Sequence, residues 1–202
     1  MTSGKRGWHI AKEKLIQLKL DILLTEAAIL FSHKGYSATS LDEIAEKLSI
    51  TKTAIYHYVK NKNDLLYQCY LRSIESTEEC YRKAATTGDT GLQKMIHYLQ
   101  LDAESGPVAM TPLTELDSLK DIKARKDFEQ RLKKCEGIFI GFIEEGINDG
   151  SITDCDPEMT MQFILGSSRW MMKWYSPDGR KDLPEIVDLF LKFILNGLVP
   201  RQ

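Results

Sequence analysis

Apolar residues recur along most of this chain at spacings of three and four positions, with charged residues between them. That spacing is typical of amphipathic α-helices, whereas half-buried strands alternate apolar and polar residues, a pattern this sequence lacks. The spacing predicts nine or ten helices, the clearest of which cover residues 14–33, 63–84, 92–101, 118–148, 157–175 and 183–198. The expected fold class is all-α.

Two short helices joined by a tight turn are predicted between residues 40 and 59. Ser40 can cap the first helix while Glu43 bonds back to the cap, and apolar residues then follow at helical spacing: Leu41, Ile44, Ala45 and Leu48. Thr51 can cap the second helix, in which Ile55 and Val59 form an inner edge. The pattern predicts a helix-turn-helix unit.

The outer edge of the second helix carries hydrogen-bonding and aromatic side chains, namely Lys52, Thr53, Tyr56, His57 and Lys60. A helix of this size fits the major groove of DNA, which is about 12 Å wide, where such groups reach base edges and phosphates. A solvated face on an ordinary amphipathic helix is the competing interpretation.

Several separated motifs surround this unit: Ala27-Ala28-Ile29-Leu30-Phe31, Gly35-Tyr36, Thr39-Ser40, Ile44-Ala45, and Ile55-Tyr56-His57-Tyr58 with Lys62 and Leu65. Together they resemble the DNA-binding domain of the TetR family of bacterial repressors. One position departs from the pattern, because Val59 stands where most of the family has phenylalanine. The resemblance implies an N-terminal arm and a three-helix, homeodomain-like DNA-binding domain over residues 1–62. It implies a helical ligand-binding and dimerisation domain over residues 63–202.

The same resemblance implies roles for individual residues. Base-reading and groove-lining positions fall on Lys52, Thr53, Ala54, Tyr56 and His57, and phosphate-contacting positions on Thr39, Ser40, Thr51, Tyr58 and Lys62. Ala54 has no hydrogen-bonding group, but its methyl can contact a thymine methyl. Two roles have simpler alternatives, since Tyr58 can serve packing and Thr51 can act only as a cap.

Charge is distributed unevenly. Residues 1–72 carry a net charge of +4 and the remainder −6, which is expected when only the first part meets a polyanion. Lys5, Arg6, Lys12 and Lys14 form a basic arm ahead of the first helix. It is either a disordered tail or a segment that reaches the minor groove or the backbone.

The last two helices have apolar side chains on more than one face. One face can be buried internally, and the other favours a partner. The family resemblance implies a homodimer through these helices, and the expected interface residues are Trp170, Trp174, Phe190 and Phe193. A thick internal core is the alternative.

The segment 165–179 carries the spacing Gly-x-x-x-Trp-x-x-x-Trp-Tyr, from Gly166 to Tyr175. It is similar to a subgroup of the TetR family that responds to acyl-CoA thioesters. Arg169 stands where that subgroup often has asparagine; it can serve a phosphate or carboxylate, or pair with an acidic residue across the dimer. Expected pocket walls, which could equally be core, are Met95, Tyr98, Leu99, Met110, Phe128, Phe139, Phe142, Phe163 and Trp170.

The expected function is that of a transcription repressor that binds double-stranded operator DNA and is released by a small hydrophobic or acyl-CoA-type inducer. The alternative is a DNA-bound structural protein without an inducer. An enzyme is not expected, because phosphate-binding loops and catalytic motifs are missing and the four histidines are scattered. Four widely spaced cysteines favour neither disulfides nor zinc, so no metal or cofactor is expected. With no apolar segment of membrane-spanning length or signal peptide, the expected location is the cytoplasm, with no membrane partner.

Overall fold

The computed structural model describes residues 3–106, 113–175 and 178–198. In these ranges the chain forms eight α-helices, a 3-10 helix and no strand, which confirms the all-α class. The elements are α1 (Ser3–Lys34), α2 (Leu41–Lys47), α3 (Lys52–Ile55), α4 (Lys62–Thr87), α5 (Gly91–Glu104), η2 (Leu113–Ser118), α6 (Ile122–Asp149), α7 (Pro157–Trp174) and α8 (Leu183–Leu198).

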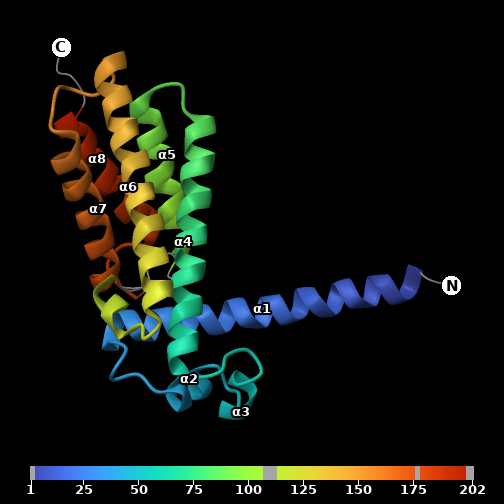
Figure 1. Ribbon diagram of the computed structural model, residues 1–202. Helices are drawn as coiled ribbons and strands as arrows, with labels where there is room; N and C mark the ends of the chain where they lie inside the picture. The colour runs from blue at the N-terminus through green and yellow to red at the C-terminus, as the bar shows by residue number, and fades with distance from the viewer. Residues whose placement is uncertain (1–2, 107–112, 176–177, 199–202) are drawn as a thin grey trace.

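The helices α1, α2 and α3 gather at one end of the molecule, and α4 rises from them into a bundle with α5, α6, α7 and α8 (Figure 1). The buried apolar residues form one connected cluster, which runs from α1 through α4 into the bundle. Helix α4 contributes to both ends of it: Leu65 and Leu66 are buried near its start, and Tyr81 and Ala84 near its end. A movement of α4 would therefore shift buried residues both next to α1 and inside the bundle.

Helix α1 is longer than predicted, because it begins at Ser3 instead of near residue 13. The basic arm thus lies on a helix that projects beyond the body on the side away from α7 and α8 (Figure 1). No proline interrupts residues 3–34, so nothing in the sequence forces a later start. The helix ends where predicted, at Gly35, which has a φ of 86° and donates its amide to Phe31 O at 3.0 Å.

The other helix ends follow local capping chemistry. Asp156 caps α7 through the Met159 amide at 2.9 Å, with Pro157 at the first helical position as predicted. Gly150, with a φ of 79°, ends α6 in the left-handed conformation. Met110, which was expected in a pocket wall, lies outside the described residues. None of the described helices combines the length and apolar character needed to cross a membrane.

Candidate DNA-binding site

The predicted helix-turn-helix forms with both hydroxyl caps in place, but the Glu43 carboxylate pairs with Lys34 of α1 instead of bonding back to the Ser40 cap. The Ser40 hydroxyl accepts from the Glu43 amide at 3.1 Å, and the Thr51 hydroxyl accepts from the Ala54 amide at 3.2 Å. Between the helices, Ser49 takes a φ of 53°, which turns the chain sharply. The two helices are therefore held at a fixed angle by backbone geometry.

The second helix is shorter than the prediction. Only Lys52–Ile55 is α-helical, and the chain then continues in turns in which the Tyr58 and Val59 amides bond to Ile55 O at 2.9 and 3.2 Å. β-branched and aromatic residues dominate this stretch and have low helix propensity. The inner edge is as predicted, because Ile55 and Val59 are buried.

The outer face of α3 is open to solvent. Lys52, Thr53 and His57 are exposed, Tyr56 is 49% exposed, and Ala54 is half-buried. The Lys52 ammonium lies 2.8 Å from the Asp42 carboxylate on α2, and this hydrogen bond raises the pKa of Lys52. Both partners are exposed, so DNA can compete with Asp42 for the lysine.

The residues expected to contact DNA phosphates divide into an exposed group and a buried residue. Ser40 and Thr51 are exposed caps, and the Lys62 ammonium lies 4.1 Å from the centre of the Tyr36 ring beside the unit. Thr39 instead is 2% exposed, and its hydroxyl donates to Leu30 O at 3.3 Å and Gly35 O at 2.9 Å. The structure thus turns the Thr39 hydroxyl inward, where it holds the α1–α2 turn.

Sequence reasoning did not single out Asn63, in the first turn of α4. Its amide nitrogen donates to Ser118 O at 2.8 Å, and its amide oxygen accepts from the Lys120 amide at 3.1 Å. The same nitrogen lies 3.4 Å from the Tyr36 hydroxyl in the α1–α2 turn. One side chain thus ties the helix-turn-helix, the start of α4 and the segment before α6 together. The sequence signals only that Asn63 lies near a helix start.

Helices α7 and α8 expose a row of large apolar side chains. Trp170 is 63%, Trp174 57% and Phe193 85% exposed, with Met159, Phe163 and Leu189 exposed beside them. The opposite faces are buried, through Ile164, Leu165 and Leu191 among others. Both helices are therefore apolar on two faces, as predicted. Phe190 is half-buried against the core.

The expected pocket residues do not all come together. Met95, Tyr98, Leu99, Phe128, Phe139 and Phe142 are buried in the bundle, but Phe163 and Trp170 lie on the exposed face of α7. A hollow between α4, α6 and the segment that joins η2 to α6, lined in part by Tyr67, Leu119 and Phe128, measures about 10 Å³, room for one water at most. Arg169 lies 3.8 Å from Glu136 of the same chain.

A capped helix-turn-helix with an exposed recognition face, joined by one long helix to a helical body, defines a DNA-binding transcription regulator. Residues 23–69 match the family description "Bacterial regulatory proteins, tetR family", and residues 92–198 match "Tetracyclin repressor-like, C-terminal domain". The second match covers more than half of the chain, which therefore belongs to the TetR family of transcription regulators.

Among its relatives is the HTH-type transcriptional repressor KstR2 of Mycolicibacterium smegmatis, 24% identical over 187 residues that cover 90% of this chain and 91% of the relative. The structure of the ketosteroid transcriptional regulator KstR2 of Mycobacterium tuberculosis is similar, with a TM-score of 0.78, 20% identity and coverage of 91% and 96% of the two chains. The structure of AibR in complex with isovaleryl coenzyme A and operator DNA has a TM-score of 0.71 and 24% identity, over 88% and 98%. The chain is thus a regulator and not an enzyme, and a purely structural DNA-bound protein is not favoured.

Proposed function

We propose that this chain is a homodimeric repressor that binds operator DNA through α3 and is released by a small hydrophobic or acyl-CoA-type ligand. The exposed polar face of α3, presented by two capped turns and a buried inner edge, is the observation that supports it most. We take residues 1–62 as the DNA-binding part and residues 63–202 as the body that binds the ligand and the second copy.

Individual DNA contacts follow from exposure. We assign base contacts to the outer side chains Lys52, Thr53, Ala54, Tyr56 and His57, and phosphate contacts to Ser40, Thr51, Tyr58 and Lys62. Thr39 is left out of this set, because its hydroxyl is buried and already donates to two carbonyls.

A second copy of the chain is the occupant proposed for the α7–α8 face. Three aromatic side chains there are more than half exposed, and both helices contribute exposed apolar residues. Burying them against a twofold copy would remove a large apolar area from water. A twofold axis would also present two α3 helices to one duplex, whose operator half-sites lie about one DNA turn, roughly 34 Å, apart.

The ligand class is supported by AibR, whose structure contains isovaleryl coenzyme A together with operator DNA. Within the described residues the bundle interior is rich in buried aromatic side chains, and the hollow beside Tyr67 has room for one water at most, so the proposed ligand binds a more open arrangement of the bundle. A ligand that binds the open form better shifts the population toward it, and DNA that binds the closed form opposes it.

The contact made by Asn63 offers a route for this coupling. Because its amide bonds to both Ser118 O and the Lys120 amide, a shift of the segment before α6 would pull on the first turn of α4. Helix α4 packs against α1, so the pull would change the separation of the two α3 helices in a dimer.

A direct test measures binding to a fluorescent DNA fragment from upstream of the chain's own gene. Coenzyme A thioesters of short, medium and long acyl chains are titrated in, with coenzyme A alone as the control. We expect specific binding without ligand and release by at least one thioester. Specific DNA binding that no thioester weakens would leave a regulator with another ligand class, and no DNA binding at all would contradict the whole proposal.

A further inference from the structure

Four aromatic rings meet in the middle of the bundle. Tyr81 of α4 and Tyr98 of α5 stack with their ring centres 3.8 Å apart and 12° between the planes. Phe139 and Phe142 of α6 lie against them, at 5.5 Å from Tyr98 and 6.2 Å from Tyr81 respectively. Both tyrosines are at most 4% exposed. Their hydroxyls are therefore held among apolar rings, where polar groups are costly unless hydrogen-bonded.

The Tyr81 hydroxyl is the unusual group in this cluster. It lies beside Tyr98, yet within the described part of the chain it makes no hydrogen bond of normal geometry. Almost all buried hydroxyls in folded proteins have a partner, so an exception calls for a specific explanation. A phenylalanine would fill the same space without this penalty.

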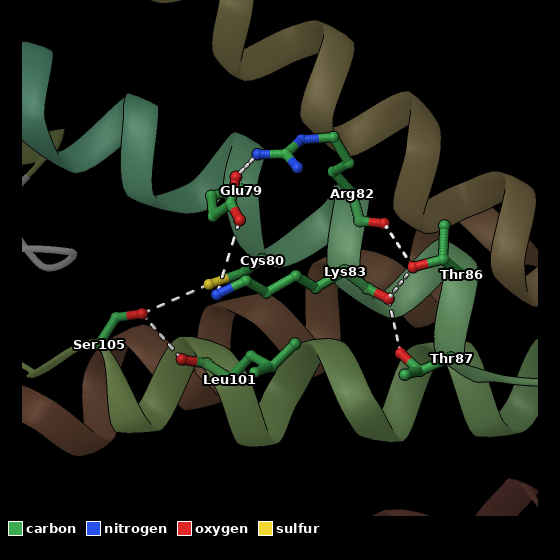
Figure 2. Close-up of polar contacts among 8 residues, drawn as sticks. All are labelled: Glu79, Cys80, Arg82, Lys83, Thr86, Thr87, Leu101 and Ser105. Carbon is green, nitrogen blue, oxygen red and sulfur yellow. Dashed lines mark hydrogen bonds and ion pairs between the residues drawn. The ribbon is translucent and has the colours of Figure 1, made fainter.

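An acidic group completes the cluster. Asp102 lies one helical turn after Tyr98 on α5, on the same face of the helix. Burial raises the pKa of Asp102 to about 6, which Arg169 and Tyr98 partly oppose, so the group is still mainly ionised at neutral pH. The C-terminal end of α5 contacts α4, because the Cys80 thiol of α4 and the hydroxyl of Ser105, which follows α5, lie 3.3 Å apart (Figure 2).

Arg169 of α7 acts on all three groups electrostatically while its side chain stays 42% exposed. Its ion pair with Glu136 of α6 is long, at 3.8 Å. The arginine therefore lies at the seam between α6 and α7, between the solvent and the buried cluster. It could exchange Glu136 for an anionic group of a ligand.

We infer that Tyr81 and Asp102 form the polar end of the inducer site and recognise a hydroxyl group on an apolar molecule, whose anionic group Arg169 holds at the rim. The ligand hydroxyl would accept from the Tyr81 hydroxyl and donate to the Asp102 carboxylate, while the four rings surround its apolar part. This inference rests on the proposed ligand response, and it adds the chemical class: a hydroxylated apolar acid or its coenzyme A thioester.

The first test is thermal unfolding of the full chain without ligand. Tyr81→Phe is compared with Tyr67→Phe, a matched change on α4 at an exposed tyrosine. We expect Tyr81→Phe to unfold at the same or a higher temperature than the wild type, because it removes a buried hydroxyl that lacks a good partner. A drop of several degrees in Tyr81→Phe alone would show that the hydroxyl is satisfied in the fold and overturn the inference.

The second test is binding of ω-hydroxydecanoic acid against decanoic acid, each as the free acid and as its coenzyme A thioester. We expect the hydroxylated forms to bind about tenfold more tightly to the wild type and to Tyr67→Phe, and the preference to vanish in Tyr81→Phe. If the free acid binds more strongly than the thioester, Arg169 pairs with the ligand carboxylate. If the thioester binds more strongly, Arg169 pairs with a phosphate of coenzyme A. Equal binding of hydroxylated and plain forms, or no binding of any, overturns the inference.

Arg169→Gln tests whether Arg169 holds the anionic group of the ligand. It should weaken binding of whichever anionic form, free acid or thioester, the wild type prefers. Unchanged affinity would refute this role of Arg169. Operator binding by the wild type without ligand is measured as well, because it distinguishes failure of this inference from failure of the proposed repressor function. A wild type that binds its operator but shows no hydroxyl preference contradicts only this inference. A wild type that binds no operator contradicts the proposed function itself.

Discussion

At the scale of single residues, Lys62 is the clearest candidate for a phosphate contact. Its ammonium lies 4.1 Å from the centre of the Tyr36 ring, at the start of α4 beside the helix-turn-helix unit. Lys62→Ala should weaken binding to all DNA sequences about equally and reduce the slope of log affinity against log salt by about one. Anisotropy titrations at several salt concentrations, on operator and unrelated DNA, measure both. A loss confined to the operator would place Lys62 among the base-reading residues instead.

Lys52 should behave differently, because it projects from the start of α3. Replacing it with alanine should cost about 1–3 kcal/mol on the preferred operator and relax the preference at one or two base pairs. Selection of binding sites from a random DNA library would show the relaxed positions. Asp42→Asn is the matched control, since it removes the 2.8 Å partner of Lys52 but leaves the lysine in place, and should not broaden specificity. Uniform weakening by Lys52→Ala, without altered preference, would assign the residue to phosphate.

Asp102 gives a prediction on pH. Burial raises its pKa from 3.8 to about 6, against the opposing effects of Arg169 and the Tyr98 hydroxyl, so the folded chain binds this proton more tightly than the unfolded chain. Its contribution to stability therefore falls as the pH rises from about 4 to 6, by roughly 3 kcal/mol in total, and is constant above. Asp102→Asn should remove this fall in the free energy of unfolding between about pH 4 and 6, which urea unfolding at several pH values measures. The exposed Asp154→Asn should keep it; equal slopes in Asp102→Asn and the wild type would contradict the assignment.

Residue chemistry explains which parts of the site the sequence could predict. The caps at Ser40 and Thr51 and the buried Ile55 depend on neighbours a few positions away, so spacing predicts them well. The inward turn of Thr39 depends on how α1 ends, and the bonds of Asn63 depend on a segment 55 residues later. Such long-range contacts leave no local pattern in a single sequence.

At the scale of elements, the joint between α4 and the segment before α6 depends on one side chain. In Asn63→Ala, the Lys120 amide loses its acceptor, and we expect faster hydrogen exchange at that amide and a lower unfolding temperature. Asn63→Asp keeps an acceptor for Lys120 but cannot donate to Ser118 O, so it should protect the Lys120 amide better than alanine does. Exchange followed by NMR measures this directly. Unchanged exchange at Lys120 in Asn63→Ala would show that the segment is held by other contacts.

Element lengths were predicted well where caps define them and poorly where they do not. The last helix covers 183–198 as predicted, and α7 begins at Pro157 after a capping aspartate. Helix α1 extends ten residues further than expected because nothing breaks it, although Leu15, Leu18 and Ile22 are about half exposed along it. Helix α3 is shorter than expected because the aromatic and β-branched residues that follow Ile55 have low helix propensity, although the Val59 amide still bonds to Ile55 O.

At the scale of the whole molecule, the proposed function depends on two copies that present their α3 helices together. Replacing both Trp170 and Trp174 with alanine removes two side chains that are 63% and 57% exposed in one chain, and should shift the protein from a dimer toward the 23.1 kDa monomer. Sedimentation velocity over a range of concentrations measures the shift. Leu18→Ala, a change of a 57% exposed leucine on α1, is the control and should remain dimeric. The monomer should lose most of its operator affinity, because one α3 helix then binds without the second. A double variant that sediments as the wild type does would place the interface elsewhere on the molecule.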